Sequence, residues 1–173
     1  MKGKKMFCYA LLTAILAGVV TLATWQMNGW PSSVGKPVTY ITFISWAAYF
    51  LFGANIKGAS KAFSSMIAGI VAAILMFVLS ILFGFVPWWA VPLAVVILVI
   101  FMMYAEKVSL INNVAAVFMG TGLYFSLSAA GAFSTFSITE YLLVGLTELV
   151  YVIIGFAAGW ITIQFNIMCS KMK

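Results

Sequence analysis

Three side chains with strong acid–base, metal-binding or anion-binding chemistry are missing from this chain of 173 residues, which has no histidine, no aspartate and no arginine. Their absence excludes Ser-His-Asp and Cys-His nucleophile systems, histidine metal sites and the bidentate grip of arginine on phosphate or carboxylate. Any chemistry would have to run on glutamate, lysine, tyrosine and serine. We therefore expect no enzyme activity, no catalytic residue, no metal site and no cofactor.

Charge is also scarce, since charged residues make up 7% of the chain and hydrophobic residues 65%. A soluble fold of this size exposes too much surface to hide so many apolar side chains. The composition predicts an all-α polytopic membrane protein, with residues 1–173 forming a single transmembrane domain. Nucleic-acid binding is not expected, because the lysines flank apolar runs instead of forming a basic face on a soluble domain.

Six apolar stretches separated by polar or Gly- and Pro-containing breaks predict six transmembrane helices. The approximate ranges are 6–26, 38–54, 62–84, 88–105, 108–130 and 140–164. The first follows three lysines and resembles a signal peptide, but it is long enough to span a bilayer and we expect it to remain as a helix. The second has about 17 residues and several hydroxyl side chains, so hydropathy alone also allows a re-entrant segment there.

The lysines test this count. With six crossings, eight of the nine lysines fall on one side and only Lys36 on the other, whereas a second stretch that fails to cross would give a split of six to three. The positive-inside rule favours six crossings with both termini in the cytoplasm. Cys8 and Cys169 would then lie on the cytoplasmic side, where we expect no structural disulfide.

Two apolar segments share a pattern, FISWAAYFLFGA at residues 43–54 and FMGTGLYFSLSA at residues 118–129. In register, Phe43 aligns with Phe118, Tyr49 with Tyr124 and Phe50 with Phe125. This echo predicts two inverted three-helix repeats, because three crossings place successive units in opposite orientations. The alternative is a chance alignment within a small apolar alphabet.

The order of the parts also resembles a known family. A first span that ends in a tryptophan-containing Gly/Pro loop is followed by ISWAAYFLFGANIKG, a third span rich in small residues and, later, AAVFMGTGLYFS. This order is similar to that of the YcdZ-like bacterial inner-membrane proteins, a small six-span family classed as a domain of unknown function, over most of residues 6–165. The resemblance implies a bacterial inner-membrane location and brings no established substrate, catalytic residue or cofactor.

Glu148 is the sharpest candidate for function. It lies about eight residues into the last expected helix, roughly 12 Å along its axis, and no lysine lies in a span to pair with it. An ionised carboxylate is costly in lipid, so the side chain should face the bundle interior, a subunit interface or water. The alternative is a structural carboxyl that is protonated, or bonded to Thr147, Tyr151 or a neighbouring helix. Glu140 is expected at the membrane interface, favoured by the helix dipole.

Side chains of the second and fifth stretches complete the candidate site. We expect solute or proton binding at Glu148 together with Tyr49, Tyr124, Trp46, Asn113 and Thr121. A constriction is expected from Phe43, Phe50, Phe118 and Phe125. The alternative for the aromatic residues is helix and lipid packing, and the polar residues of the fifth stretch either hold helices together or line a route.

These features predict a membrane channel or transporter for a small neutral solute or weak acid, either passive or proton-linked. A chain this small is expected to form a closed symmetric homo-oligomer, for which a trimer is our guess. The alternative function is a non-transporting integral membrane subunit whose small-residue stripes dock a partner protein.

Overall fold

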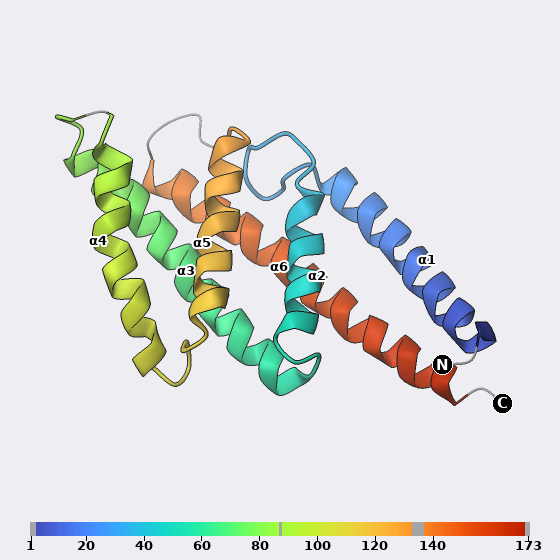
Figure 1. Cartoon of the computed structure of the whole chain (residues 1–173). Helices are drawn as coiled ribbons and strands as arrows, with labels where there is room; N and C mark the ends of the chain where they lie inside the picture. Colours follow the sequence, from blue (N-terminus) through green and yellow to red (C-terminus); the bar gives the residue numbers. More distant parts are fainter. Residues whose placement is uncertain (1–2, 87, 133–136, 172–173) are drawn as a thin grey trace.

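The computed structural model describes residues 3–86, 88–132 and 137–171, and within these ranges it is helical and contains no strand. Successive helices run in alternating directions, so the first and last helices have their outer ends at the same end of the molecule (Figure 1). This confirms the all-α class. The helices are α1 (Gly3–Met27), α2 (Thr39–Leu51), α3 (Ile56–Leu82), α4 (Ala90–Tyr104) with a 3-10 turn η1 (Ala105–Lys107), α5 (Val114–Ala129) and α6 (Ile138–Ser170).

Four segments in the described part are long and apolar enough to cross a membrane: α1, α3, α4 with η1, and α6. The helices α2 and α5 are apolar but have only 13 and 16 residues. At 1.5 Å per residue they extend about 20 and 24 Å, less than the roughly 30 Å of a bilayer's hydrocarbon core. The structure is thus that of a helical membrane protein, and the count of six crossings stays a prediction.

The fifth helix begins later than the sequence predicts. Asn113 caps α5, because its side-chain oxygen accepts a hydrogen bond from the backbone N–H of Ala116 at 3.1 Å. A capping asparagine satisfies an N–H that has no partner within the helix, which fixes the helix start after it. Residues 108–113 therefore form a segment outside α5, where the sequence suggested its opening turns.

The two ends of the molecule differ in charge and in aromatic content. The α1–α2 and α3–α4 connections lie at one end and the α2–α3 and α4–α5 connections at the other (Figure 1). Lys36 lies at the first end, which we call the lysine-poor end, and four exposed tryptophans gather there, Trp25, Trp30, Trp88 and Trp89. Lys4, Lys5, Lys57, Lys61, Lys107 and Lys171 lie at the lysine-rich end.

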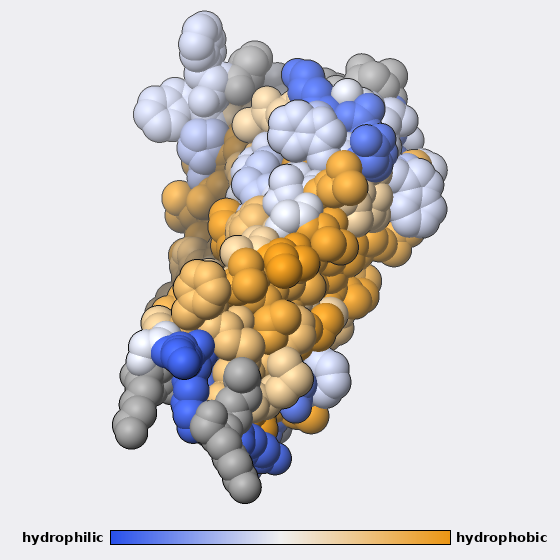
Figure 2. Space-filling view, turned by 90° about the vertical axis from the view of Figure 1, so that its right-hand side faces the viewer, coloured by the Kyte–Doolittle hydropathy of each residue, from blue (hydrophilic) through white to orange (hydrophobic). Residues whose placement is uncertain are grey.

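An apolar band separates the two polar ends on the face where α1 and the end of α6 lie (Figure 2). Tryptophan is enriched where a membrane protein passes from hydrocarbon to headgroups. The band and the tryptophans at its edge are the arrangement expected of helices embedded in a bilayer.

Glycines let two pairs of helices touch along their backbones. A Cβ atom on Gly155 of α6 would collide with the carbonyl oxygen of Thr42 and lie 2.9 Å from the backbone nitrogen of Trp46, both in α2. In the same way, a Cβ on Gly69 of α3 would collide with the carbonyl oxygen of Val117 and lie 2.9 Å from the nitrogen of Thr121, both in α5. Small residues at such crossings allow the close approach on which helix association in membranes depends.

Gly155→Ala should therefore lower the stability of the folded protein by about 1–3 kcal/mol, the usual cost of overpacking. The matched control is Gly122→Ala, because a Cβ at Gly122 meets no atom within 4 Å. That control should be neutral or stabilising, since alanine is the better helix former. Thermal unfolding in detergent, followed by size-exclusion chromatography, measures both, and equal effects would contradict the backbone contact at Gly155.

The start of α1 is fastened to the end of α6. The Nζ of Lys5 donates a hydrogen bond to the carbonyl oxygen of Ser170 at 3.0 Å. Cys8 and Cys169 are free cysteines, and their Sγ atoms lie 2.9 Å apart. The two cysteines are far apart in sequence but adjacent in space, which residue spacing alone did not reveal.

A mild oxidant such as copper phenanthroline should therefore join Cys8 to Cys169 within one chain, because the thiols need little movement to meet. Mass spectrometry of the digested, unreduced protein should show one cross-linked peptide pair, and Cys8→Ser should abolish it. Cross-links that form only between chains would contradict the placement of α1 against α6.

Candidate functional site

Glu148 lies on the buried face of α6, ten residues after Ile138 and so roughly 15 Å along the helix axis. Its side chain is 0% exposed. Neither carboxyl oxygen has a hydrogen-bond partner among the residues that the structure describes. Burying a carboxyl without a partner is costly, whether the group stays charged or takes up a proton. The buried carboxyl thus forms no hydrogen bond within the described structure that would stabilise the fold.

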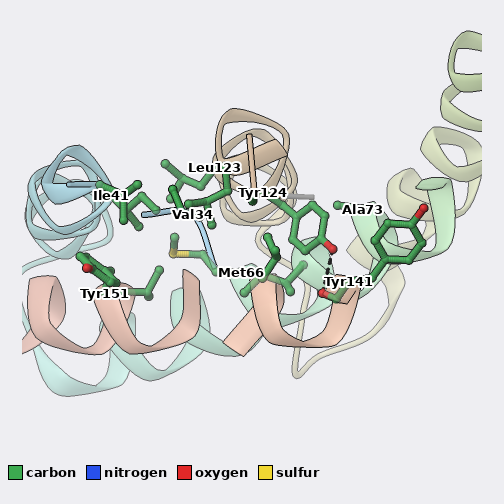
Figure 3. Close-up of a cluster of buried hydrophobic side chains, with 14 of the residues drawn as sticks. Val34, Ile41, Met66, Ala73, Leu123, Tyr124, Tyr141 and Tyr151 are labelled. Atoms are coloured by element: carbon green, nitrogen blue, oxygen red, sulfur yellow. Dashed lines mark hydrogen bonds between the residues drawn. The ribbon is translucent and has the colours of Figure 1, made fainter. Parts of the chain in front are cut away.

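Glu148 lies on α6 along the stretch that contributes to a large cluster of buried side chains. The cluster contains side chains from α2, α3, α5, α6 and the α1–α2 loop, among them Tyr141 and Tyr151 of α6 (Figure 3). These two tyrosines precede and follow Glu148 in the sequence. Tyr40 and Tyr124 are close enough to Glu148 to interact with it electrostatically. The structure therefore brings Tyr124, one of the predicted site residues, near the carboxyl.

Both of these tyrosine hydroxyls have hydrogen-bond partners of their own. The hydroxyl of Tyr124 donates to the carbonyl oxygen of Tyr141 at 2.8 Å (Figure 3). The hydroxyl of Tyr40 shares a hydrogen bond with Ser126 at 3.0 Å, which joins α2 to α5. Neither hydroxyl forms a hydrogen bond with the Glu148 carboxyl in the described structure.

Thr147 and Tyr151, the local partners considered for Glu148, bind the α1–α2 loop instead. The Thr147 hydroxyl donates to the carbonyl oxygen of Leu143 at 2.9 Å and accepts from the backbone N–H of Ser32 at 2.9 Å. The Tyr151 hydroxyl accepts from the N–H of Gly29 at 3.1 Å and donates to the carbonyl oxygen of Thr24 at 3.3 Å. The alternative of a structural carboxyl bonded to these two side chains is therefore not what the structure shows.

The α1–α2 loop, residues 28–38, folds into the bundle instead of standing in solvent. Val34 and Val38 are buried, and Val34 points into the cluster between Tyr151 and Tyr124 (Figure 3). Gly29 has a φ of +82°, and a Cβ there would lie 2.7 Å from the Cβ of Val34. Only glycine combines this backbone conformation with so close an approach, so Gly29 allows the loop to turn back over α6.

A small cavity lies outside this loop at the lysine-poor end. It has a volume of about 10 Å³ and is lined by Ser32, Ser33, Ala132, Glu140 and Leu143. That space is on the order of a single water molecule. It reaches Ser32 and Leu143, two of the residues that hydrogen-bond to Thr147, but Glu148 itself has no exposed surface in this conformation.

The other predicted polar and aromatic site residues bind neighbouring helices. Tyr49 is buried, and its ring meets that of Phe156 edge-on at 6.2 Å. Trp46 is buried with Val20 of α1 and Ala158 of α6. Both side chains hold α2 in its place in the bundle, which is the packing alternative considered from the sequence.

Thr121 and Asn113 also have structural contacts. The Thr121 hydroxyl lies 3.0 Å from the carbonyl oxygen of Gly69, within hydrogen-bonding distance, at the point where α5 crosses α3. Asn113 caps α5, and its backbone N–H donates to the Ser65 hydroxyl at 3.3 Å. Neither contact involves Glu148.

The four predicted constriction residues do not surround a common passage within one chain. Phe43, Phe50 and Phe118 are 41%, 39% and 42% exposed and so lie on the outer surface. Phe125 packs on Phe77 with ring centroids 5.0 Å apart. An apolar aromatic ring packs equally well against lipid and against another helix, so the sequence did not decide between these two environments. A constriction between chains of an oligomer stays a prediction.

Long apolar helices, an apolar band with tryptophans at its edge and a buried carboxyl define an integral membrane protein. A family model described as protein of unknown function (DUF1097) matches residues 10–167, so the chain belongs to this family. No curated protein and no solved structure matches the chain. Membership confirms the expectation of an uncharacterised domain family, and it supplies no activity.

Replacing the carboxyl by an apolar side chain of similar length should stabilise the fold. We expect Glu148→Met to raise the free energy of unfolding by about 1–3 kcal/mol, because it removes an unsatisfied buried polar group. Tyr151→Phe, which loses the hydrogen bonds to Gly29 and Thr24, should lower it by about 1 kcal/mol. Thermal unfolding in detergent measures both, and a Glu148→Met protein less stable than Tyr151→Phe would show that the carboxyl has a stabilising partner.

Proposed function

We propose that this protein is a membrane transporter for a small neutral solute or weak acid, with Glu148 as the solute- or proton-binding group. The observation that carries the proposal is the full burial of a carboxyl whose two oxygens have no partner in the described structure. An ionisable group inside a membrane protein is costly and marks a solute or proton route by default. A proton or a solute donor group would supply the missing partner.

The closed surroundings favour a proton-linked transporter over a passive channel. Glu148 has no exposed surface, so a solute reaches it only after the bundle changes conformation. A carboxyl that exchanges its proton during such a change couples solute movement to a proton gradient.

The glycine contacts support the inverted repeat. In the register that aligns Phe43 with Phe118, Thr42 corresponds to Val117 and Trp46 to Thr121. Gly155 meets the carbonyl oxygen of the first residue and the backbone nitrogen of the second in α2, and Gly69 meets the same two atoms of the corresponding residues in α5. The units α1–α3 and α4–α6 run in opposite directions (Figure 1). Inverted three-helix units that meet around a buried site are a recurring design of secondary transporters.

We also infer six crossings, with α2 and α5 as short spans, and place the lysine-rich end and both termini in the cytoplasm. The distribution of lysines between the two ends supports this orientation. The same proposal includes a location in the bacterial inner membrane, the YcdZ-like identity and a homo-oligomer, for which a trimer is our guess. The exposed Phe43, Phe50 and Phe118 provide apolar surface for lipid or for a second chain.

Solute flux into proteoliposomes tests the proposal. Small amides, polyols and short-chain acids are compared for the wild type and Glu148→Gln, with and without an imposed pH gradient. Glu140→Gln is the matched control, because Glu140 lies on the same helix in its first turn. We expect protein-dependent flux that responds to the pH gradient, a loss of that response in Glu148→Gln and none in Glu140→Gln.

Flux that is the same in wild type and Glu148→Gln would reduce the carboxyl to a structural group. The absence of flux for every solute would contradict the transporter and favour the second candidate, a membrane subunit that docks a partner protein.

A further inference from the structure

The loop at the lysine-poor end is attached to α6 by hydrogen bonds, and we call such an attachment a latch. We call residues 28–38 the first loop. Its backbone N–H groups at Gly29 and Ser32 donate to the hydroxyls of Tyr151 and Thr147 at 3.1 and 2.9 Å. These two hydroxyls flank Glu148 along α6, so the loop closes the bundle directly at the carboxyl.

A segment at the lysine-rich end is latched to α3 in a similar way. We call residues 108–113 the second loop. The backbone N–H of Asn113 donates to the Ser65 hydroxyl at 3.3 Å, and the Ser64 hydroxyl donates to the carbonyl oxygen of Leu110. This loop connects the first and second helices of its half and binds the third helix of the other half, as the first loop does.

The two hydroxyls that accept these loop N–H groups, those of Ser65 and Tyr151, occupy equivalent positions relative to the crossing glycines. Ser65 lies four residues before Gly69, and Tyr151 lies four residues before Gly155. Those two glycines make the matching backbone contacts with α5 and α2. A hydroxyl one turn before the crossing glycine therefore binds a loop backbone N–H in both halves, at opposite ends of the molecule.

The two ends differ in the volume of the space beside each loop. The first loop buries Val34 and leaves a cavity of about 10 Å³. Beside the second loop lies a polar cavity of about 430 Å³, lined by Lys61, Met103, Glu106, Asn112, Asn113 and Val114. Both loops are latched in this conformation, in agreement with the full burial of Glu148.

We propose that the two loops are the alternating gates to Glu148, the first held shut by Thr147 and Tyr151 and the second by Ser64 and Ser65. The identity of the group behind the gates rests on the proposed function. The gating does not depend on the proposed function, because access to residue 148 from each side is measurable without any transported solute.

The test uses Glu148→Cys as a reporter in a background with Cys8→Ser and Cys169→Ser. A membrane-impermeant methanethiosulfonate reagent is added to right-side-out or inverted membrane vesicles, and the rate of labelling is measured by mass spectrometry. Exposed Ser33 and Ser60, replaced singly by cysteine, identify which vesicle side presents the lysine-poor and the lysine-rich end.

Thr147→Val should raise the labelling rate from the lysine-poor end about fivefold, the effect of one net hydrogen bond on a closed state, and Thr147→Ser should restore it. Ser65→Ala should raise the rate from the lysine-rich end alone. The matched control is Thr162→Val, because among the described residues the Thr162 hydroxyl bonds only within its own helix, to the carbonyl oxygen of Ala158. Rates that rise equally from both sides, or no more than in Thr162→Val, would overturn the proposal.

Hydrogen–deuterium exchange keeps the proposal testable if the reporter protein does not fold. In otherwise wild-type protein in detergent, Thr147→Val should accelerate exchange within residues 28–38 and leave residues 108–113 unchanged, whereas Ser65→Ala should do the reverse. Acceleration of both loops by either variant would show general loosening and would contradict two separate gates.

Discussion

The close backbone contact of α6 with α2, and of α3 with α5, is the constraint on which the rest of the structure depends. Gly155 and Gly69 remove the side chain that would hold each pair of helices apart. Once α2 and α5 lie this close to α6 and α3, the loops that precede the short helices reach the long helices. The latches at Tyr151 and Ser65 follow from that geometry, since each lies one turn from the crossing.

Glu148 is a difference between the two proposed repeats. It lies seven residues before Gly155, and the position seven residues before Gly69 is Ala62, which is buried like Glu148 but has no polar side chain. At this pair of matching positions, one proposed repeat therefore has a titratable side chain and the other an apolar one. The proposed transport function would use both features, because inverted repeats provide two related conformations and the carboxyl provides a site.

Much of the fold could be predicted from the sequence, because hydropathy and polar breaks are local. The order of the helices follows the apolar runs, and the charge difference between the ends follows the lysines. The start of α5 was missed because Val108 to Ile111 are apolar enough to continue a helix, and hydropathy does not detect a capping asparagine. The end of α6 was also missed, since the expected span ends at about residue 164 and the helix continues to Ser170.

The site was predictable only in part. The burial of Glu148 follows from the cost of a carboxylate in lipid, which a single sequence reveals. The loop contacts of Thr147 and Tyr151 join residues more than a hundred positions apart and depend on tertiary structure. No local signal marks Gly29 or Ser32 as their partners. The outward direction of Phe43 and Phe118 also depends on how each helix is rotated against its neighbours. A helix that is apolar on most of its faces does not show in its sequence which face is buried.

The central claim is that the Glu148 carboxyl exchanges its proton or binds solute as the protein works. Infrared difference spectroscopy of the reconstituted protein tests it most directly, with acetamide, glycerol and acetate added in turn across a range of pH. The account predicts a carboxyl band that changes with pH and with at least one solute, and that is missing in Glu148→Gln. A band assigned to Glu148 that responds to neither pH nor any of these solutes would contradict the account.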